Sequence, residues 1–200
     1  EQRTIMLAGV SHDLRTILTR FRLQLAMMAT PHVDALKRDV DEMQQMLEDY
    51  MAFAKGDAGE KPRRVHVGRL LEEVKAAAEA PGRVVRLEVR PDPLLVTLKR
   101  NAFKRAIVNL VSNASRYSDV ILIRALGSKR WLTIAIEDNG PGIPPDKRED
   151  VFRPFHSLDS ARNQNKKSTG LGLAIARDIV RSHGGEIALD ESVLGGLKAV

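Results

Sequence analysis

Apolar side chains near the start of the chain recur every three or four positions, which is the spacing of an amphipathic helix. The first series is Leu7, Val10, Leu14, Ile17 or Leu18, Phe21, Leu25 and Met28. It predicts a helix over 2–29 that Thr30-Pro31 ends; the same two residues suit the start of a next helix. The second series is Leu36, Val40, Met43, Leu47, Tyr50 and Ala54.

His12 falls outside the first apolar stripe. At about 100° per residue, it lies roughly 160° from Leu14 and is predicted to point outward. Thr16 lies one turn further along the same face. Most exposed histidines have no chemical role, so this helix alone leaves both a solvated and a reactive His12 open.

The two helices form a hairpin over 1–55 that buries little surface by itself. A second copy related by a two-fold axis is the simplest partner, which predicts an all-α helical hairpin forming a dimeric four-helix bundle. Residues 56–62 (GDAGEKP) are polar and rich in helix-breaking residues, so they predict a linker between domains.

From residue 63 onward the pattern mixes two periodicities. It predicts helices over 70–80, 101–116 and 171–182, and strands over 84–89, 94–98, 120–125, 131–137, 186–189 and 197–200. Residues 63–200 are therefore expected to form an α/β sandwich with helices on one face of a sheet.

Composition narrows the function classes. The net charge is +6, but the basic residues are interspersed with 26 acidic ones and aromatic residues are only 4%, so nucleic acid is not an expected partner. No cysteine is present, which excludes thiolate chemistry. No apolar run approaches the ~20 residues of a membrane span. Because the chain starts at Glu1 without a methionine, we expect a fragment of a longer protein that is not itself embedded in a membrane.

Three segments of the second domain carry residues suited to a nucleotide. Asn109 and Asn113 lie one helical turn apart, where their amide oxygens can ligate Mg²⁺. Arg116 lies near them and can supply a positive charge that pairs with a phosphate. Asp138 ends a strand before Gly140 and Gly142, where a carboxylate can accept a hydrogen bond from an exocyclic amine. Taken singly, a solvated helix face and an ordinary glycine turn explain these patterns equally well.

The third segment, residues 168–174 (STGLGLA), leads into a helix whose free N–H groups suit phosphate. Before it lies a polar stretch over 153–167, a length typical of functional lids, with Phe152 and Phe155 as candidate anchors at its start. Arg162, Lys166 and Lys167 are expected to be solvated. None of the segments is a Walker A or a dinucleotide-binding fingerprint.

Together and in this order, the motifs resemble the cytoplasmic catalytic core of EnvZ-like sensor histidine kinases of two-component systems. Residues 11–16 (SHDLRT) match the H box and 109–117 (NLVSNASRY) the N box. Residues 138–142 (DNGPG), 152–155 (FRPF) and 170–173 (GLGL) match the first glycine box, the F box and the second glycine box. The resemblance covers nearly the whole chain and implies a Bergerat-type ATP-binding fold for residues 63–200.

The resemblance also implies residue roles. His12 would be the phosphorylated residue, Asp13 the acid that orients or deprotonates it, and Thr16 a residue that positions water for dephosphorylation of the regulator. Asn113 would hold Mg²⁺ and Asp138 would read adenine. The implied ATP-binding set is Asn109, Asn113, Arg116, Tyr117, Asp138, Gly140, Gly142, Ile143, Phe155, Thr169, Gly170, Leu171, Gly172 and Leu173.

The implied cofactors are ATP and Mg²⁺, and the implied partners are a second copy of the chain and an OmpR-like response regulator. The resemblance places the chain in the cytoplasmic portion of an inner-membrane sensor. Two alternatives stay open: an ATPase of the gyrase, chaperone and mismatch-repair type without phosphotransfer, and an ATP-binding dimeric scaffold with weak or no kinase activity.

Two positions depart from the family pattern. Ser168 stands where a glycine usually precedes the threonine of the lid, so this position lacks the flexibility that the glycine gives the lid in the family. Ile17 stands where a proline usually follows the threonine of the H box. Proline would remove a hydrogen bond to the carbonyl of Asp13 and bend the helix, whereas isoleucine preserves both the bond and the apolar stripe.

We therefore expect Ile17→Pro to bend the first helix one turn after His12 and to change the ratio of autokinase to phosphatase activity. The two activities would be measured on the variant and the parent chain side by side. An unchanged ratio would contradict the prediction.

Overall fold

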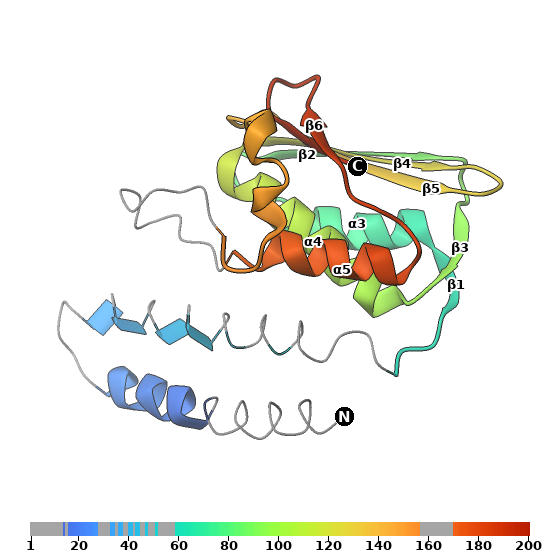
Figure 1. Ribbon diagram of the computed structural model, residues 1–200. Coiled ribbons are helices and arrows are strands. Elements are labelled where there is room, and N and C mark those ends of the chain that lie inside the picture. The colour runs from blue at the N-terminus through green and yellow to red at the C-terminus, as the bar shows by residue number, and fades with distance from the viewer. Residues whose placement is uncertain are drawn as a thin grey trace. The chain divides into compact units, whose positions relative to one another are not determined.

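The computed structural model divides the chain into two compact units, Glu1–Ala58 and Gly59–Val200 (Figure 1). It describes residues 14, 16–27, 33, 34, 36, 37, 40, 41, 43, 44, 47, 51, 59–156 and 170–200. The finer division into 1–55, a linker over 56–62 and 63–200 stays a prediction.

The first unit is helical in its described parts, including an uninterrupted stretch over 16–26. Arg22 joins its two segments, because Nε lies 3.2 Å from the Asp41 carboxylate and NH1 donates to Gln44 Oε1 at 3.1 Å. The small core between the segments consists of Leu18, Leu25, Val33 and Val40, with Leu47 packed against it. The predicted helical region is thus confirmed.

The predicted apolar stripe of the first helix is only partly buried within one chain, as expected for a hairpin that buries little surface by itself. Leu18 and Leu25 are buried, but Ile17 is 46% and Phe21 is 50% exposed, and Leu14 is exposed as well. The physical reason is that the helix carries two adjacent apolar rows, and the other segment of the hairpin covers only one of them. The second segment repeats this, with Leu36 and Met43 exposed beside buried Val33 and Val40.

The second unit is built on a mixed five-stranded sheet. Its order is β2 (Val84–Arg90), β4 (Val120–Gly127), β5 (Leu132–Asp138), β7 (Leu197–Ala199) and β6 (Leu189–Glu191). β2 and β4 are parallel and every other neighbouring pair is antiparallel. A separate two-stranded sheet pairs β1 (Arg63–His66) with β3 (Leu95–Leu98).

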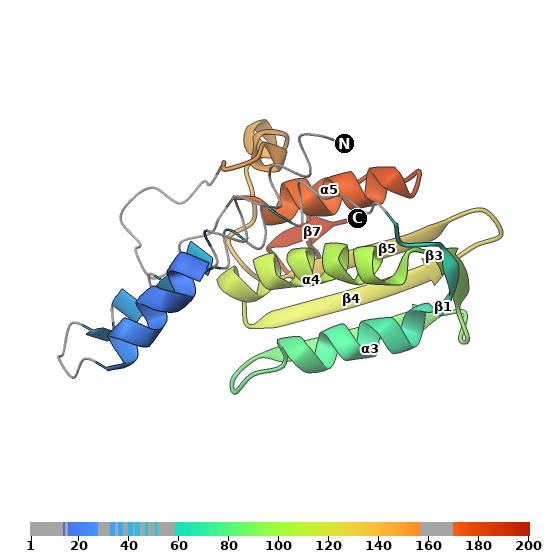
Figure 2. The same cartoon turned by 90° about the horizontal axis from the view of Figure 1, so that it is seen from below.

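Three helices cover one face of the five-stranded sheet (Figure 2). They are α3 (Val67–Ala78), α4 (Arg100–Tyr117) and α5 (Gly172–Ser182), and α4 packs against both of the others. Two short 3-10 helices, η1 (Pro145–Lys147) and η2 (Asp150–Phe152), follow β5. The prediction of an α/β sandwich with helices on one face is confirmed.

Most predicted boundaries lie within two residues of the observed ones, but the starts of two elements differ by three residues, and β1 was not predicted. Helix α3 begins at Val67 rather than residue 70, because the His66 side chain caps it: Nδ1 accepts from the Arg69 amide at 3.4 Å. The strand predicted over 186–189 is also displaced, because β6 is Leu189–Glu191. β6 is an edge strand, so Asp190 and Glu191 are exposed and the strand lacks the apolar alternation that marks an inner one.

The N-terminus of α4 is capped from two distant parts of the chain. Glu60, which falls within the predicted linker, accepts from the Asn101 amide at 2.8 Å and from the Ala102 amide at 3.0 Å. His183, just after α5, accepts from the Lys99 amide through Nε2 at 3.2 Å. The first amides of a helix have no partner inside the helix, and the side chain of the N-cap residue Lys99 makes no capping hydrogen bond. Glu60 and His183 therefore satisfy amides at the start of α4 that would otherwise lack an acceptor.

The pKa of Glu60 lies below its ordinary value of 4.5. Partial burial alone would raise it, but the hydrogen bonds from the Asn101 and Ala102 amides and the charges of Arg63 and Lys99 outweigh that effect. A carboxyl with a depressed pKa stabilises the fold fully above its unfolded-state pKa, and that stabilisation is lost as the pH falls through the lower folded-state value.

We expect Glu60→Ala to lower the free energy of unfolding by about 1 kcal/mol at neutral pH, as for other lost N-caps. The difference from the parent chain should shrink as the pH falls below 4.5. Urea unfolding at several pH values measures it. Glu72→Gln is the matched control, because Glu72 is exposed and its ion pair is a 3.9 Å contact with Lys75. An equal loss in both variants, or a difference independent of pH, would contradict the prediction.

Candidate functional site

Asp138 ends β5 and is a buried carboxylate, only 4% exposed. Its Oδ1 accepts from the Gly140 amide at 2.8 Å and from the Leu197 amide at 3.1 Å. Both bonds go to the same oxygen, so Oδ2 has no donor among the residues that the structure describes. A carboxylate fixed through one oxygen keeps the other available as an acceptor.

Two backbone segments approach Asp138 closely: at Gly196 a Cβ does not fit, and at Gly140 its neighbours would have to shift. A Cβ on Gly196, in the β6–β7 turn, would overlap Asp138 Oδ1 and lie 2.5 Å from the Gly140 nitrogen. A Cβ on Gly140 would lie 3.0 Å from the carbonyl oxygen of Tyr117, in the last turn of α4. The end of β5 is therefore packed between a turn, a helix end and the Gly140 segment.

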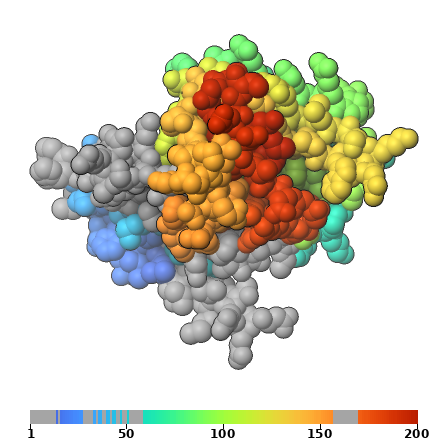
Figure 3. All heavy atoms as spheres, turned by 45° about the horizontal axis from the view of Figure 1, so that its top comes forward, coloured from blue at the N-terminus to red at the C-terminus, as the bar shows by residue number. Residues whose placement is uncertain are grey.

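The β6–β7 turn was absent from the predicted site. The signal available in the sequence was the pair Gly195-Gly196 before the last strand, which marks a turn but gives no indication of what it packs against. Figure 3 shows this C-terminal segment in red beside the orange segment that follows β5. Arg148 NH1 joins them, 3.5 Å from the Leu189 carbonyl oxygen and 3.4 Å from Asp190 Oδ1.

Asn109 and Asn113 are half-buried on α4, one turn apart. The side-chain nitrogen Nδ2 of Asn109 is buried and has no hydrogen-bond partner within the part of the chain that the structure describes. Gly172, the first residue of α5, lies against Asn109, whose Cβ would be 3.9 Å from a Cβ added there. Among the described residues no side chain caps α5 at Leu171, so the start of this helix, at Gly172, lies against Asn109 without a side-chain cap.

The two ends of the segment between η2 and α5 are joined by backbone. The Phe155 amide donates to the Gly170 carbonyl at 3.0 Å. Gly170 has φ +66°, and a Cβ there would lie 2.7 Å from the Phe155 carbonyl carbon. Of the two candidate anchors, Phe152 is buried, whereas Phe155 is 67% exposed and is held by its main chain rather than by its ring.

The other predicted site residues differ in burial, and some of them lie outside the described residues. Leu171 is buried, whereas Arg116, Tyr117, Ile143 and Leu173 are half-buried, and Gly142 has φ +69°. Thr16 is helical and exposed in the first unit. His12, Asp13 and Thr169 lie outside the described residues, as do Arg162, Lys166, Lys167 and Ser168.

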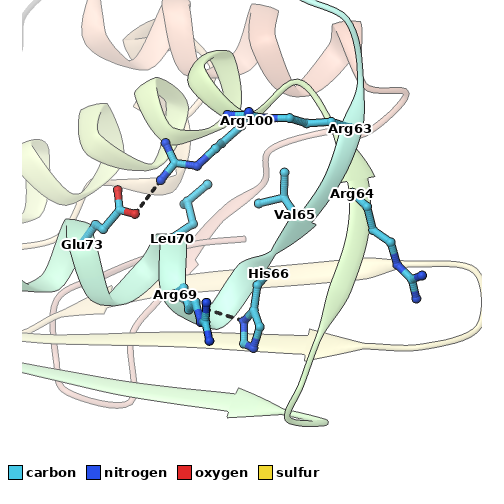
Figure 4. Close-up of a pocket in the computed structure, with 8 residues that line it drawn as sticks. All are labelled: Arg63, Arg64, Val65, His66, Arg69, Leu70, Glu73 and Arg100. Atoms are coloured by element: carbon cyan, nitrogen blue, oxygen red, sulfur yellow. Dashed lines mark hydrogen bonds and ion pairs between the residues drawn. The ribbon is translucent and has the colours of Figure 1, made fainter.

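A separate hollow of about 280 Å³ lies on β1, the start of α3 and the first residue of α4 (Figure 4). Its lining includes Arg63, Arg64 and Arg69, and Arg100 pairs there with Glu73. None of the predicted nucleotide residues lines it. Among the described residues there is no cluster of three or more histidine or acidic side chains that suits a metal, and no helix is long and apolar enough to cross a membrane.

Two family models match the chain. Residues 98–200 match the histidine kinase-, DNA gyrase B- and HSP90-like ATPases, and residues 2–59 match the His Kinase A phospho-acceptor domain. The chain therefore belongs to this ATPase family and has the two-domain composition of a sensor histidine kinase catalytic core. This confirms the family resemblance inferred from the motifs.

Individual relatives agree with this assignment. The chain is 32% identical to the sensor histidine kinase CpxA of Escherichia coli K12, over 98% of this chain and 45% of CpxA. It is 31% identical to the sensor protein RstB of the same strain, over 96% of this chain and 47% of RstB. The solved histidine kinase domain of the E. coli osmosensor EnvZ is 35% identical, with a TM-score of 0.54, over 71% of this chain and 88% of that one. The chain thus spans less than half the length of CpxA and RstB.

Proposed function

We propose that this chain is an ATP-dependent protein-histidine kinase that phosphorylates His12 and passes the phosphoryl group to an aspartate of an OmpR-like response regulator. The proposal rests on two features of one chain. Residues that include His12 match a phospho-acceptor domain, and the ATPase domain holds a buried Asp138 that uses only one of its carboxylate oxygens for backbone amides. Neither module alone would favour a kinase over the other ATPases of the family.

The residues present fit ATP. Asp138 Oδ2 is free to accept from the exocyclic amine of adenine, since Oδ1 already holds two backbone amides. Asn109 Nδ2, which has no partner among the described residues, and the first amides of α5, a helix start that no described side chain caps, are donors suited to phosphate. Gly140, Gly142, Gly170 and Gly172 let backbone approach the ligand, and Arg116, Tyr117, Ile143, Phe155, Thr169, Leu171 and Leu173 complete the proposed binding set.

Asn113 is the proposed Mg²⁺ ligand, with Asn109 beside it. No hydrogen bond within the described residues engages the Asn113 side chain, so its amide oxygen is available to a hard cation. When bound, Mg²⁺ would neutralise charge on the phosphates. The chain's own contribution is to present neutral oxygens and backbone donors without adding negative charge at that point.

The proposed chemistry is a transfer of the γ-phosphoryl group between two bound partners. A ring nitrogen of neutral His12 attacks the γ-phosphorus, the bond to the oxygen of ADP breaks, and Asp13 orients the ring and takes its proton. The phosphoryl group then moves from His12 to a carboxylate oxygen of the regulator. Thr16, which is exposed, is proposed to position water for a separate phosphatase reaction, in which water attacks the regulator's aspartyl phosphate, the bond to the carboxylate oxygen breaks and inorganic phosphate leaves.

A dimer fits the exposed apolar row of the first unit. Leu14, Ile17 and Phe21 on one segment, and Leu36 and Met43 on the other, are the residues that a second hairpin would cover in a four-helix bundle. By family likeness, the chain would be the cytoplasmic part of an inner-membrane sensor.

Sedimentation equilibrium at micromolar concentration should give a dimer of the parent chain. Phe21→Glu, which places a charge in the exposed apolar row, should shift the equilibrium toward monomer. A monomeric parent chain would contradict this part of the proposal.

Incubation with γ-labelled ATP and Mg²⁺ tests the kinase. We expect acid-labile label on the parent chain and none on His12→Ala, with ADP binding equal in the two proteins. Label that persists in the variant would refute His12 as the acceptor. ATP binding without any label would favour the dimeric scaffold, and ATP hydrolysis without label would favour an ATPase that lacks phosphotransfer.

A further inference from the structure

Glu137 is a fully buried carboxylate, 0% exposed, beside Asp138 on β5. Successive strand residues point to opposite faces, so Glu137 lies on the face away from the helices while Asp138 lies toward them. Burying a charge is costly unless it is paired and hydrogen-bonded. Glu137 is not among the proposed ATP-binding residues, so its burial has to be explained by the contacts that it makes.

Each oxygen of Glu137 holds a different part of the sheet. Oε1 forms an ion pair with Arg124 of β4, 3.0 Å from NH1. Oε2 accepts from the Ser192 hydroxyl at 3.4 Å and from the Val193 amide at 3.3 Å, both in the β6–β7 turn. The turn thereby covers the carboxylate, and the carboxylate fixes the turn to β5.

The turn is held together by hydrogen bonds around Ser192. The Leu194 amide donates to the Ser192 hydroxyl at 3.0 Å, the Gly195 amide to the Ser192 carbonyl at 2.9 Å, and the Ser192 amide to the Gly196 carbonyl at 2.9 Å. A displacement of Ser192 therefore moves Gly196 with it.

The far end of the same turn holds Asp138. The Gly196 amide donates to the Asp138 carbonyl at 3.1 Å, and the Leu197 amide donates to Asp138 Oδ1 at 3.1 Å. The turn thus links the Glu137 carboxylate on one face of β5 to the Asp138 carboxylate on the other.

We propose that Glu137 is a positioning residue for base selection: it holds the β6–β7 turn so that the Leu197 amide orients the Asp138 carboxylate. The inference rests on the proposed function, because it requires Asp138 to read adenine. Adenine offers an amine donor to a fixed carboxylate oxygen, whereas guanine offers a carbonyl acceptor at the same ring position and is repelled. A poorly held carboxylate can turn away, so discrimination between the two bases falls.

The test compares ADP and GDP binding by calorimetry on the full chain. Glu137→Met keeps the side-chain length but removes both acceptors, and Arg124 keeps its second partner, Glu88, 3.6 Å away. We expect ADP to bind about tenfold more weakly and GDP equally, which corresponds to the loss of a well-placed hydrogen bond. Glu137→Gln, which retains an acceptor oxygen for the turn, should restore most of the ratio.

Glu88→Met is the matched control, since Glu88 contacts the same arginine but is exposed and does not touch the turn. A merely structural Glu137 would change the amount of folded protein and leave the ADP-to-GDP ratio of the folded molecules unchanged, which would overturn the inference. If Glu137→Met does not fold, Ser192→Ala decides: a lowered ratio supports the inference and an unchanged ratio overturns it. Failure of the parent chain to bind ADP would instead refute the proposed function, and the inference with it.

Discussion

One carboxylate oxygen, Asp138 Oδ1, joins parts of the chain that are otherwise far apart in sequence. It accepts amides from the segment after β5 and from the start of β7, 59 residues later. Around it, Gly140 meets the last turn of α4 and Gly196 meets the end of β5. A larger side chain at either glycine would separate these elements. The spacing of the candidate site therefore depends on a hydrogen-bonded contact too tight for any Cβ.

The helix α4 is the second element on which the site depends, because it carries both asparagines and packs against α3 and α5. Its position along its own axis is set at both ends. Glu60 and His183 bind amides at its start, and the Tyr117 carbonyl lies against Gly140 at its end. Asn109 and Asn113 are thus held at a defined distance from Asp138 by contacts that involve neither asparagine.

Periodicity was enough to predict most of the helices and strands that have one buried face, and motif spacing singled out Asp138, the asparagines and the glycines as candidate site residues, a role that stays a proposal. What could not be predicted are contacts between residues distant in sequence. Glu137 occupies an outward position on its strand, where an acid is normally solvated, and only a turn 55 residues later buries it. Glu60 lies in a stretch whose composition is typical of a linker, and its capping role depends on a helix that begins 40 residues later. Phe155 has the character of an anchor, but its backbone rather than its ring is held.

The cap formed by Glu60 bears on where the ATPase unit can be cut. A chain shortened to the predicted domain, residues 63–200, keeps every strand and helix of the unit but omits the carboxylate that holds the Asn101 and Ala102 amides. Those two amides would then be left to solvent, at the start of the helix that bears Asn109 and Asn113. The hydrogen-bonded structure of the second unit therefore reaches three residues further toward the N-terminus than its strands and helices do, and only Gly59 separates Glu60 from the boundary at Ala58.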